Sequence, residues 1–412
     1  MFRRSFLLGI LLAIYYYYAI PFFENRLKPH WLLPNVNPVS PYRPLQKNQH
    51  KLASNSYLDA RYSQPGNRQQ IGKENATMVM LCRNSDLEGA LKSMRSLEDR
   101  FNRDYKYPWV FLNEVPFSEE FIEKTTLMAS GKVYHELIPE QDWEPPHFIN
   151  ETKLQENLDS SHHIIYGGYR SYRNMCHFNS GHFYRQKRLL DYEWYFRVEP
   201  DVEYMCDFQY DPFEFLRTNN KIYGFIVSFL EYENTIPTLW STVESFMQEN
   251  PDLIHPNNSL EFITTREKCY NKYVELIPSS SKYNLCHFWS NFEIANLNFF
   301  RGEPYGKYFD YLDKSGGFYY ERWGDAPVHT IGLNILLDKN QIHHFDDIGY
   351  FHPPYLSCPS SSELRASKRC ICDTKSLDKG RKTIDVDVYS CLPRWWKYGG
   401  GKTFLNEVDY IR

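Results

Sequence analysis

The sequence lacks a glycine-rich loop at the place where many nucleotide-binding folds carry one. The first predicted strand, Thr77 to Leu81, is followed by CRNSDLEGALKSMRSLEDRF, which contains a single glycine. The dinucleotide-binding and P-loop fingerprints both need closely spaced glycines, because backbone N–H groups must approach the phosphates. The absence argues against a dinucleotide dehydrogenase and against a P-loop enzyme. The phosphates of any bound nucleotide would therefore need a metal ion or side chains.

The sequence also lacks a strong net charge and any basic run interleaved with aromatic residues. Its 412 residues carry a formal charge of −4, so nothing indicates a nucleic-acid partner. The aromatic share of 17% and the charged share of 24% are ample for a packed core, which excludes a disordered protein. The length allows one large domain or two smaller ones.

The N-terminus predicts a membrane anchor. Arg3 and Arg4 precede an apolar run over residues 6–23, which is about long enough to cross a bilayer. A cleaved signal peptide is the alternative, but its apolar region would be shorter and end in small residues, whereas IPFFENR follows here. We expect a cytosolic tail at 1–5, an uncleaved signal-anchor at 6–23, an extended stem at 24–74 and a lumenal domain at 75–412.

Sequons and cysteines agree with a lumenal location. Asn75, Asn150 and Asn257 begin glycosylation triplets, although such triplets also occur by chance. Nine cysteines are an odd number, so at least one should be unpaired, and Cys82 in the apolar run TMVMLC is our choice. Four others cluster near the C-terminus, where disulfides are favoured over a zinc site because C-x-C lacks the usual knuckle spacing: Cys358, Cys370, Cys372 and Cys391.

The domain begins with alternating strands and helices. Strands are predicted at 77–81, 107–112 and 133–138, with a helix near 118–129 between the last two. A capping box of Ser85 and Glu88 should open the first helix. One face of that helix is marked by Leu87, Leu91, Met94 and Leu97. This order is typical of a Rossmann-like nucleotide-binding α/β domain.

A fourth strand ends in two carboxylates. Residues 192–198 are aromatic and β-branched, as in a buried strand, and Glu199 and Asp201 follow directly. Ligands of open α/β sheets bind outside the carboxyl ends of the strands, and such carboxylates suit a divalent cation that carries phosphates. A solvated acidic turn is the alternative. Residues 171–188 suit either a helix at the edge of the cleft or ordinary packing.

Several long strings along the chain resemble the fungal Golgi α-1,2-mannosyltransferases of glycosyltransferase family 15. The resemblance covers Ala76 to Pro359 and rests on TMVMLCRNSDL, SLEDRFN, YPWVFLNE, SYRNMC, FRVEPDV, CHFWSNFEI, ERWGDAPVHTI and HHFDDIGYFHPPY. It implies a single GT-A-like mixed α/β domain that uses GDP-mannose as donor and a divalent metal, usually Mn²⁺. Beyond Pro359 the resemblance fades, and 361–412 is expected to be a disulfide-tied cap.

The resemblance also implies metal-binding residues. Glu199 matches the family's metal-binding carboxylate, and Asp201 would contact the bound cofactor through water or only shape the turn. A histidine of IHHFDDIGY is expected on the metal, with His344 as the choice and His343 as the alternative. Without the resemblance, both histidines would more simply bind neighbouring aspartates.

Catalytic and substrate residues follow from the same strings. Glu293 would act as nucleophile or stabilise an oxocarbenium-like transition state, the alternative being a buried carboxylate paired with Arg322. Tyr172 would lie near the reacting sugar and Arg83 near the nucleotide. The sugar pockets would be lined by Trp289, Trp323 and Asp325, each of which could instead be packing. An arginine often stands in the family where this chain has His177, which would matter if that position touched phosphate or acceptor.

The function implied is a retaining mannosyltransferase that extends O-linked or N-linked mannose chains on secretory glycoproteins from a single-pass Golgi anchor. A mannosylphosphate transferase with the same donor site is one alternative. A catalytically silent Golgi protein that binds glycans or partners is the other. The residues leave the acceptor, the exact linkage and the oligomeric state open.

Overall fold

The computed structural model describes residues 73–265, 281–373, 382–385, 387 and 389–401, all within one compact unit. The predicted signal-anchor and nearly all of the stem lie outside these residues. Among the described residues, no helix has the length and apolar character needed to span a bilayer. The membrane anchor therefore stays a prediction from the sequence.

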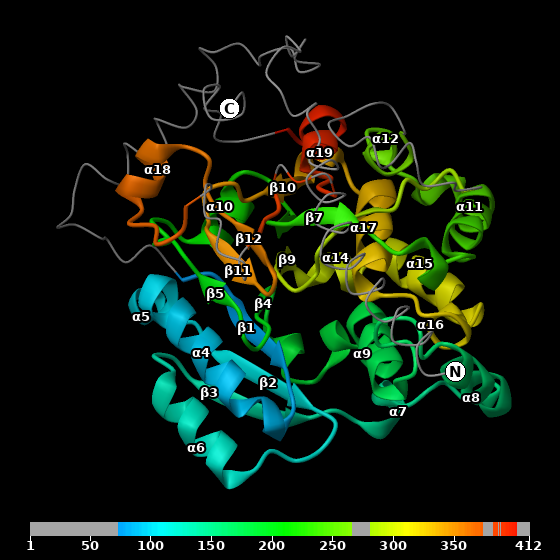
Figure 1. Ribbon diagram of the computed structural model, residues 1–412, viewed down its shortest axis with the longest axis horizontal. Coiled ribbons are helices and arrows are strands. Elements are labelled where there is room, and N and C mark those ends of the chain that lie inside the picture. The colour runs from blue at the N-terminus through cyan, green and yellow to red at the C-terminus, as the bar shows by residue number, and fades with distance from the viewer. Residues whose placement is uncertain (1–72, 266–280, 374–381, 386, 388, 402–412) are drawn as a thin grey trace, which may run out of the picture. The chain divides into compact units, whose positions relative to one another are not determined.

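A mixed seven-stranded sheet forms the centre of the described part of the chain (Figure 1). Its strand order is β10-β6-β9-β4-β1-β2-β3. Strands β1 to β4 are parallel, β9 is antiparallel to both β4 and β6, and β10 is parallel to β6. The bounds are β1 Ala76–Leu81, β2 Trp109–Asn113, β3 Val133–Leu137, β4 Trp194–Arg197, β6 Tyr223–Phe225, β9 Glu293–Asn296 and β10 Ile342–His344. The predicted mixed α/β sheet is confirmed.

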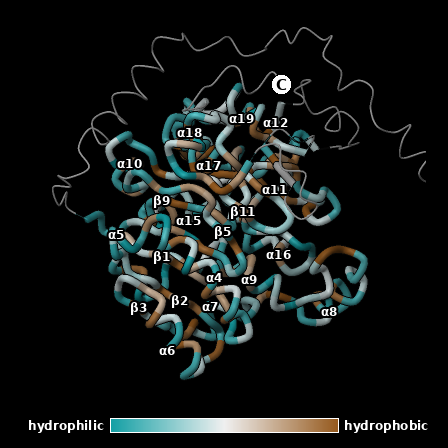
Figure 2. The backbone as a smooth tube through the Cα atoms, turned by 60° about the vertical axis from the view of Figure 1, so that its left-hand side comes forward, coloured by the Kyte–Doolittle hydropathy of each residue, from teal (hydrophilic) through white to brown (hydrophobic). Residues whose placement is uncertain are grey.

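Successive side chains of β1 and β2 pack alternately into two hydrophobic cores. Met78 and Met80 point to one core, which includes helices α4 and α6, whereas Val79 points to the other, which includes α9, α15 and α17. In Figure 1, α4 and α6 lie on one side of β1 and β2, away from α15 and α17. Hydrophobic stretches lie mainly inside and hydrophilic ones at the periphery (Figure 2). Both faces of these strands are buried, which explains their nearly continuous apolar sequences.

The helices are mostly short, and the chain alternates between strands and helices from β1 to β3 before longer helical stretches follow. Their bounds are α4 Leu87–Leu97, α5 Arg103–Tyr105, α6 Glu119–Met128, α7 Glu140–Trp143, α8 Glu151–Ser160, α9 Arg170–Gly181, α10 Pro212–Thr218, α11 Leu239–Glu249, α12 Leu260–Thr264, α14 Leu297–Arg301, α15 Glu303–Lys314, α16 Gly317–Tyr320, α17 Asp325–Leu336, α18 Ser362–Ser367 and α19 Leu392–Tyr398.

Two local predictions need correction. The capping box of Ser85 and Glu88 is wrong, because Ser85 lies within a 3₁₀ turn and the Asp86 carboxylate instead accepts the Arg83 N–H at 2.8 Å. The helix expected up to residue 188 ends at Gly181. A Cβ atom on Gly181 would lie 1.9 Å from the Phe309 ring, so α15 packs directly against the last turn of α9.

A second, smaller sheet joins distant parts of the chain. Its order is β13-β12-β11-β5, with bounds β5 Glu203–Tyr204, β11 Tyr350–His352, β12 Tyr355–Ser357 and β13 Lys382–Thr383. Strand β5 directly follows the acidic turn after β4, and β11 pairs with it antiparallel. A separate pair joins β7 Ser228–Leu230 to β8 Cys286–Phe288.

Disulfides tie the C-terminal segment to the domain. The bonds are Cys206–Cys370, Cys286–Cys391 and Cys358–Cys372. Disulfides rather than a zinc site are therefore confirmed for the four C-terminal cysteines. Cys82 is buried and unpaired as predicted, and Cys176 is a second buried free thiol that the sequence did not single out.

Candidate active site

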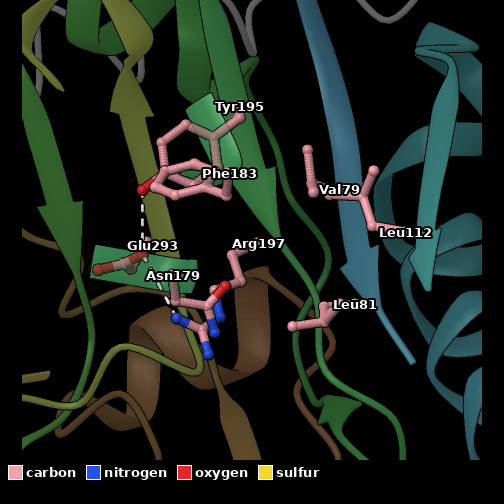
Figure 3. Close-up of a pocket in the computed structure, with 8 residues that line it drawn as sticks. All are labelled: Val79, Leu81, Leu112, Asn179, Phe183, Tyr195, Arg197 and Glu293. Atoms are coloured by element: carbon pink, nitrogen blue, oxygen red, sulfur yellow. Dashed lines mark hydrogen bonds and ion pairs between the residues drawn. The ribbon is translucent and has the colours of Figure 1, made fainter. Parts of the chain in front are cut away.

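A small cavity opens at the carboxyl ends of the parallel strands. Figure 3 shows its lining: Val79, Leu81, Leu112, Asn179, Phe183, Tyr195, Arg197 and Glu293. The strand residues supply apolar walls, and Arg197 and Glu293 supply opposite charges. This edge of the sheet is where ligands of open α/β folds bind.

Arg197, the last residue of β4, organises the charges around the cavity. Its Nε donates to Glu199 Oε1 at 2.7 Å and its Nη1 to Asp325 Oδ2 at 2.6 Å. The same Nη1 lies 3.8 Å from Glu293 Oε2. Burial alone would lower the pKa of Arg197, but the surrounding carboxylates raise it well above its ordinary value. One guanidinium thus orients three predicted site carboxylates.

Glu293 is the first residue of β9 and pairs in register with Arg197. Its side chain is buried and accepts from Tyr223 Oη at 2.9 Å and Tyr195 Oη at 2.9 Å. His329 Nδ1 lies 2.7 Å from Glu293 Oε1. Arg322, the alternative structural partner, faces Glu231 instead. The carboxylate is therefore held rigidly at the cavity, with Arg197 as its nearby guanidinium.

Asp325 begins α17, where the helix N-terminus favours a negative charge. It accepts from Ser290 Oγ at 2.7 Å as well as from Arg197. Burial would raise the pKa of Asp325, but the charge of Arg197 and these hydrogen bonds lower it below its ordinary value. Asp325 and Glu293 thus both face Arg197 Nη1, and the predicted contact of Asp325 with sugar stays a prediction.

Asp201 shapes the turn that follows β4. Its φ of 60° is in the left-handed region, and its N–H donates to the Gly89 carbonyl at 3.1 Å. A Cβ atom on Gly89 would lie 2.6 Å from Asp201 Oδ2, so a larger residue there would displace the exposed Asp201 carboxylate. Of the two roles expected for Asp201, the structure shows the one in the turn, and contact with a cofactor stays a prediction.

The structure places His344 away from Glu199. His344 lies on the edge strand β10, and β6 and β9 lie between this strand and β4. At the usual spacing of neighbouring strands, the distance between β10 and β4 is on the order of 14 Å. Its Nε2 lies 2.9 Å from the Ile226 carbonyl, and Trp396 Nε1 donates to its Nδ1 at 3.3 Å. His343, on the same edge strand, is buried. The prediction that one of these two histidines joins Glu199 on a metal is therefore wrong.

His352 is the imidazole that lies near the acidic turn. Phe351 pairs with Glu203, so the next residue of β11 reaches the start of β5 beside that turn. Burial lowers the pKa of His352, while Glu199 and Asp201 act on it in the opposite direction. Its Nδ1 donates to the Pro353 carbonyl at 3.1 Å, which leaves the lone pair on Nε2. The local sequence did not single out His352, although it lies in the same string, HHFDDIGYFHPPY, as the histidine pair.

Glu199 and His352 fit a divalent cation that is bound together with phosphates. A carboxylate oxygen and a neutral imidazole nitrogen are ligands that Mn²⁺ accepts. Elsewhere in the described part of the chain, the one cluster of three possible ligand atoms consists of disulfide-bonded cysteines: Cys206, Cys370 and Cys372. Two protein ligands would leave the other coordination positions for phosphate oxygens and water.

Two further predicted residues lie next to this centre. Trp289 packs edge-on against His352, with ring centroids 4.6 Å apart. Tyr172 lies on α9 and accepts from Arg322 Nη1 at 3.2 Å. Burial raises the pKa of Tyr172 well above its ordinary value, and Asp325 adds to this effect. Both side chains therefore lie near the charged cluster, and their contact with a sugar stays a prediction.

Three other positions differ in their access to a ligand. Trp323 is wholly buried and donates to Glu321 at 2.5 Å, so its predicted place in a sugar pocket is wrong. Arg83 is exposed at the end of β1, 3.6 Å from Glu114, and remains a candidate for nucleotide binding. His177 is buried, with its Nε2 2.9 Å from Asp313, so this departure from the family pattern lies in the interior and not at the cavity.

Comparisons with known proteins identify the family of this chain. A family model described as glycolipid 2-alpha-mannosyltransferase matches residues 40–400. The probable mannosyltransferase KTR2 of Saccharomyces cerevisiae is 54% identical over 87% of this chain and 84% of its own. The alpha-1,2 mannosyltransferase KTR1 of the same yeast is 46% identical over 79% and 78%.

A solved structure shares the fold. The crystal structure of core-mannan synthase A (CmsA/Ktr4) from Aspergillus fumigatus, in its Mn/GDP form, matches with a TM-score of 0.73 and 38% identity. The match covers 81% of this chain and 88% of that chain. The chain belongs to the glycolipid 2-alpha-mannosyltransferase family and is a mannosyltransferase.

Proposed function

We propose that the protein transfers mannose from GDP-mannose to an α-mannoside acceptor with retention of configuration, forming an α-1,2 linkage. The observation that carries the proposal is the joint placement of Glu199 and His352 beside the cluster of Arg197, Glu293 and Asp325. The Mn/GDP form of the Aspergillus fumigatus relative supports the same donor and metal for this chain.

Glu199 and His352 hold the metal in this proposal. Mn²⁺ would neutralise the charge that develops on the diphosphate as the glycosidic bond breaks. The chain has one glycine in the stretch after its first strand and hence no backbone cradle for phosphates. In this proposal Arg83, which is exposed just after β1, contacts the nucleotide.

Glu293 stabilises positive charge on the sugar. Its carboxylate is fixed by two tyrosine hydroxyls and by His329, so it does not need to reorganise as charge develops. Arg197 orients Glu293 and Glu199 together, which links the two halves of the site. Tyr172 lies next to the cluster and orients the acceptor.

The acceptors are mannose chains on secretory glycoproteins, and the enzyme acts in the Golgi lumen from a single N-terminal anchor. The disulfides and the apolar run at 6–23 support this location. Protection of the C-terminus from protease in sealed vesicles is the expected result, and cleavage there would contradict the orientation.

The full-length protein in detergent, incubated with GDP-mannose, Mn²⁺ and a panel of α-mannosides, tests the proposal. We expect an α-1,2-linked product, loss of transfer on chelation and recovery with Mn²⁺. GDP-glucose is the matched control donor and should give little product. A product that carries mannose 1-phosphate, or full turnover without divalent metal, would contradict the proposed reaction.

A further inference from the structure

A fully buried lysine lies outside the residues that the proposed transfer uses. Lys368 follows α18, and its side chain has no exposed surface. Its Nζ donates to Asp347 Oδ2 at 2.5 Å, and Tyr210 Oη donates to the other oxygen of Asp347 at 2.8 Å. We call these three residues the Lys368 clamp. A buried charge pair is costly to desolvate, so its place in the fold needs an explanation.

The backbone around Lys368 joins three segments side by side. The Lys368 carbonyl accepts from the Asp207 N–H at 2.9 Å, and the Ile371 N–H donates to the Met205 carbonyl at 2.9 Å. On the other side, the Met205 N–H donates to the Gly349 carbonyl at 2.7 Å. Residues 205–207 therefore lie between the segment that precedes β11 and the segment that follows α18. The Lys368 side chain bridges these two outer segments.

The bridged segments lead directly to the two proposed metal ligands. Residues 205–207 continue β5, which follows the turn after Glu199, and Asp347 precedes His352 by five residues along the chain. We propose that Lys368 is a positioning residue of the metal site, which holds β11 against β5 and so sets His352 relative to Glu199. This inference rests on the proposed function, because it needs a metal at these two residues.

One face of β11 has little apolar packing. The cluster on that face is limited to Met205, Cys206, Phe351, Leu356 and Cys358, with two half-buried cysteines against it, whereas Tyr350 of β11 and Tyr204 of β5 belong to the large cluster that includes α4 and α6. The face that carries Phe351 is therefore restrained by a much smaller apolar cluster than the face that carries Tyr350. A charged pair that is satisfied in only one arrangement adds geometric selectivity even where it adds little stability.

A neutral pair of similar size tests the role of the charges. The double variant Lys368→Gln/Asp347→Asn keeps two polar side chains of similar size that can hydrogen-bond to each other and removes both charges. Mn²⁺ binding in the presence of GDP is measured from the EPR signal of free Mn²⁺, and the midpoint of thermal unfolding is measured in the same buffer without metal. We expect a midpoint close to that of the wild type and a dissociation constant for Mn²⁺ raised about tenfold or more, as for other residues that orient metal ligands.

The neighbouring arginine provides a matched control. Arg369 is exposed and pairs with Asp207, which also accepts from Arg100 at 2.7 Å. Arg369→Met removes a charge one residue away from the clamp and should leave Mn²⁺ affinity unchanged. An equal loss of affinity in Arg369→Met would overturn the specific role of Lys368.

Each remaining outcome is decisive. A folded double variant with wild-type Mn²⁺ affinity overturns the inference. If the double variant does not fold, Tyr210→Phe decides, because it removes one hydrogen bond to Asp347 and keeps both charges: weaker Mn²⁺ binding supports the clamp, and unchanged binding overturns it. A wild-type protein that binds GDP but no Mn²⁺ would instead contradict the proposed metal site, and the proposed role of Lys368 with it.

Discussion

Replacing Glu293 by glutamine separates a catalytic carboxylate from a structural one. The amide oxygen can still accept from Tyr223 and lie beside His329 Nδ1, as Glu293 Oε1 does. The amide nitrogen replaces Oε2 and meets Tyr195 Oη, which must turn to accept instead of donating. Arg197 loses a contact of 3.8 Å but keeps its shorter hydrogen bonds to Glu199 and Asp325. One hydrogen bond thus changes direction and one negative charge is lost.

The two roles predict effects of different size on stability and on rate. Disturbing one buried hydrogen bond should cost about 1–3 kcal/mol of unfolding free energy. Removing a charge that stabilises the transition state should lower kcat roughly a hundredfold or more, which corresponds to about 2.7 kcal/mol of activation free energy. We therefore expect a folded variant with little turnover. Its affinity for GDP should hardly change, because Glu293 acts on the sugar and not on the nucleotide.

The assay compares kcat, KM, GDP affinity and thermal unfolding for the wild type, Glu293→Gln and Tyr223→Phe. Tyr223→Phe removes one donor to the same carboxylate and preserves its charge, so its kcat should fall much less than that of Glu293→Gln. A folded Glu293→Gln variant with normal kcat would refute the catalytic role and leave Glu293 as a structural carboxylate.

Three further predictions concern the surrounding structure. Trp323→Ala should lower the unfolding free energy by about 3–5 kcal/mol and leave KM for the donor unchanged, because the indole is buried in the core. A raised KM, measured where the variant is folded, would support the predicted place of Trp323 in a sugar pocket. Burial lowers the pKa of His182 to about 4, and the neighbouring His177 adds to this effect. The unfolded chain then binds more protons between about pH 4 and 6.5, so the unfolding free energy should fall by up to about 3 kcal/mol as the pH drops through that range. Urea titrations should show a smaller fall in His182→Asn than in the wild type, because the other buried histidines, such as His352, still contribute in both proteins. Removing the Cys286–Cys391 bond with two serines should cost about 2–4 kcal/mol of unfolding free energy, and an unchanged denaturation midpoint would show that α19 needs no covalent tie.

The sequence predicted the central sheet well because its strands are buried on both faces. The sequences of such strands are short runs of apolar residues, and β1 to β3 begin within two residues of their predicted starts. Strand β2 starts after Pro108 because proline has no N–H to offer the ladder. The position of Glu199 just after β4 could be predicted for the same reason, since the end of a buried strand can be located from its own residues, and its contact with a metal stays a prediction.

His352 could not be found from local sequence in the same way. Its place beside Glu199 depends on the antiparallel pairing of β11 with β5, two short strands that lie far apart in the chain. The adjacent pair of histidines was a stronger local signal, but β10 carries it to the far edge of the sheet. The prediction for Trp323 was wrong for a related reason. The burial of Trp323 depends on close packing against Gly317, and the residues next to Trp323 in the sequence do not indicate this contact.

Mn²⁺ binding by histidine variants tests the central claim most directly. The dissociation constant for Mn²⁺ is measured by EPR in the presence of GDP for wild type, His352→Ala and His344→Ala, with thermal unfolding as the check on folding. Loss of most Mn²⁺ affinity in His352→Ala, and wild-type affinity in His344→Ala, is the result expected from Glu199 and His352 as the metal ligands. Wild-type affinity in His352→Ala together with its loss in a folded His344→Ala would contradict that site.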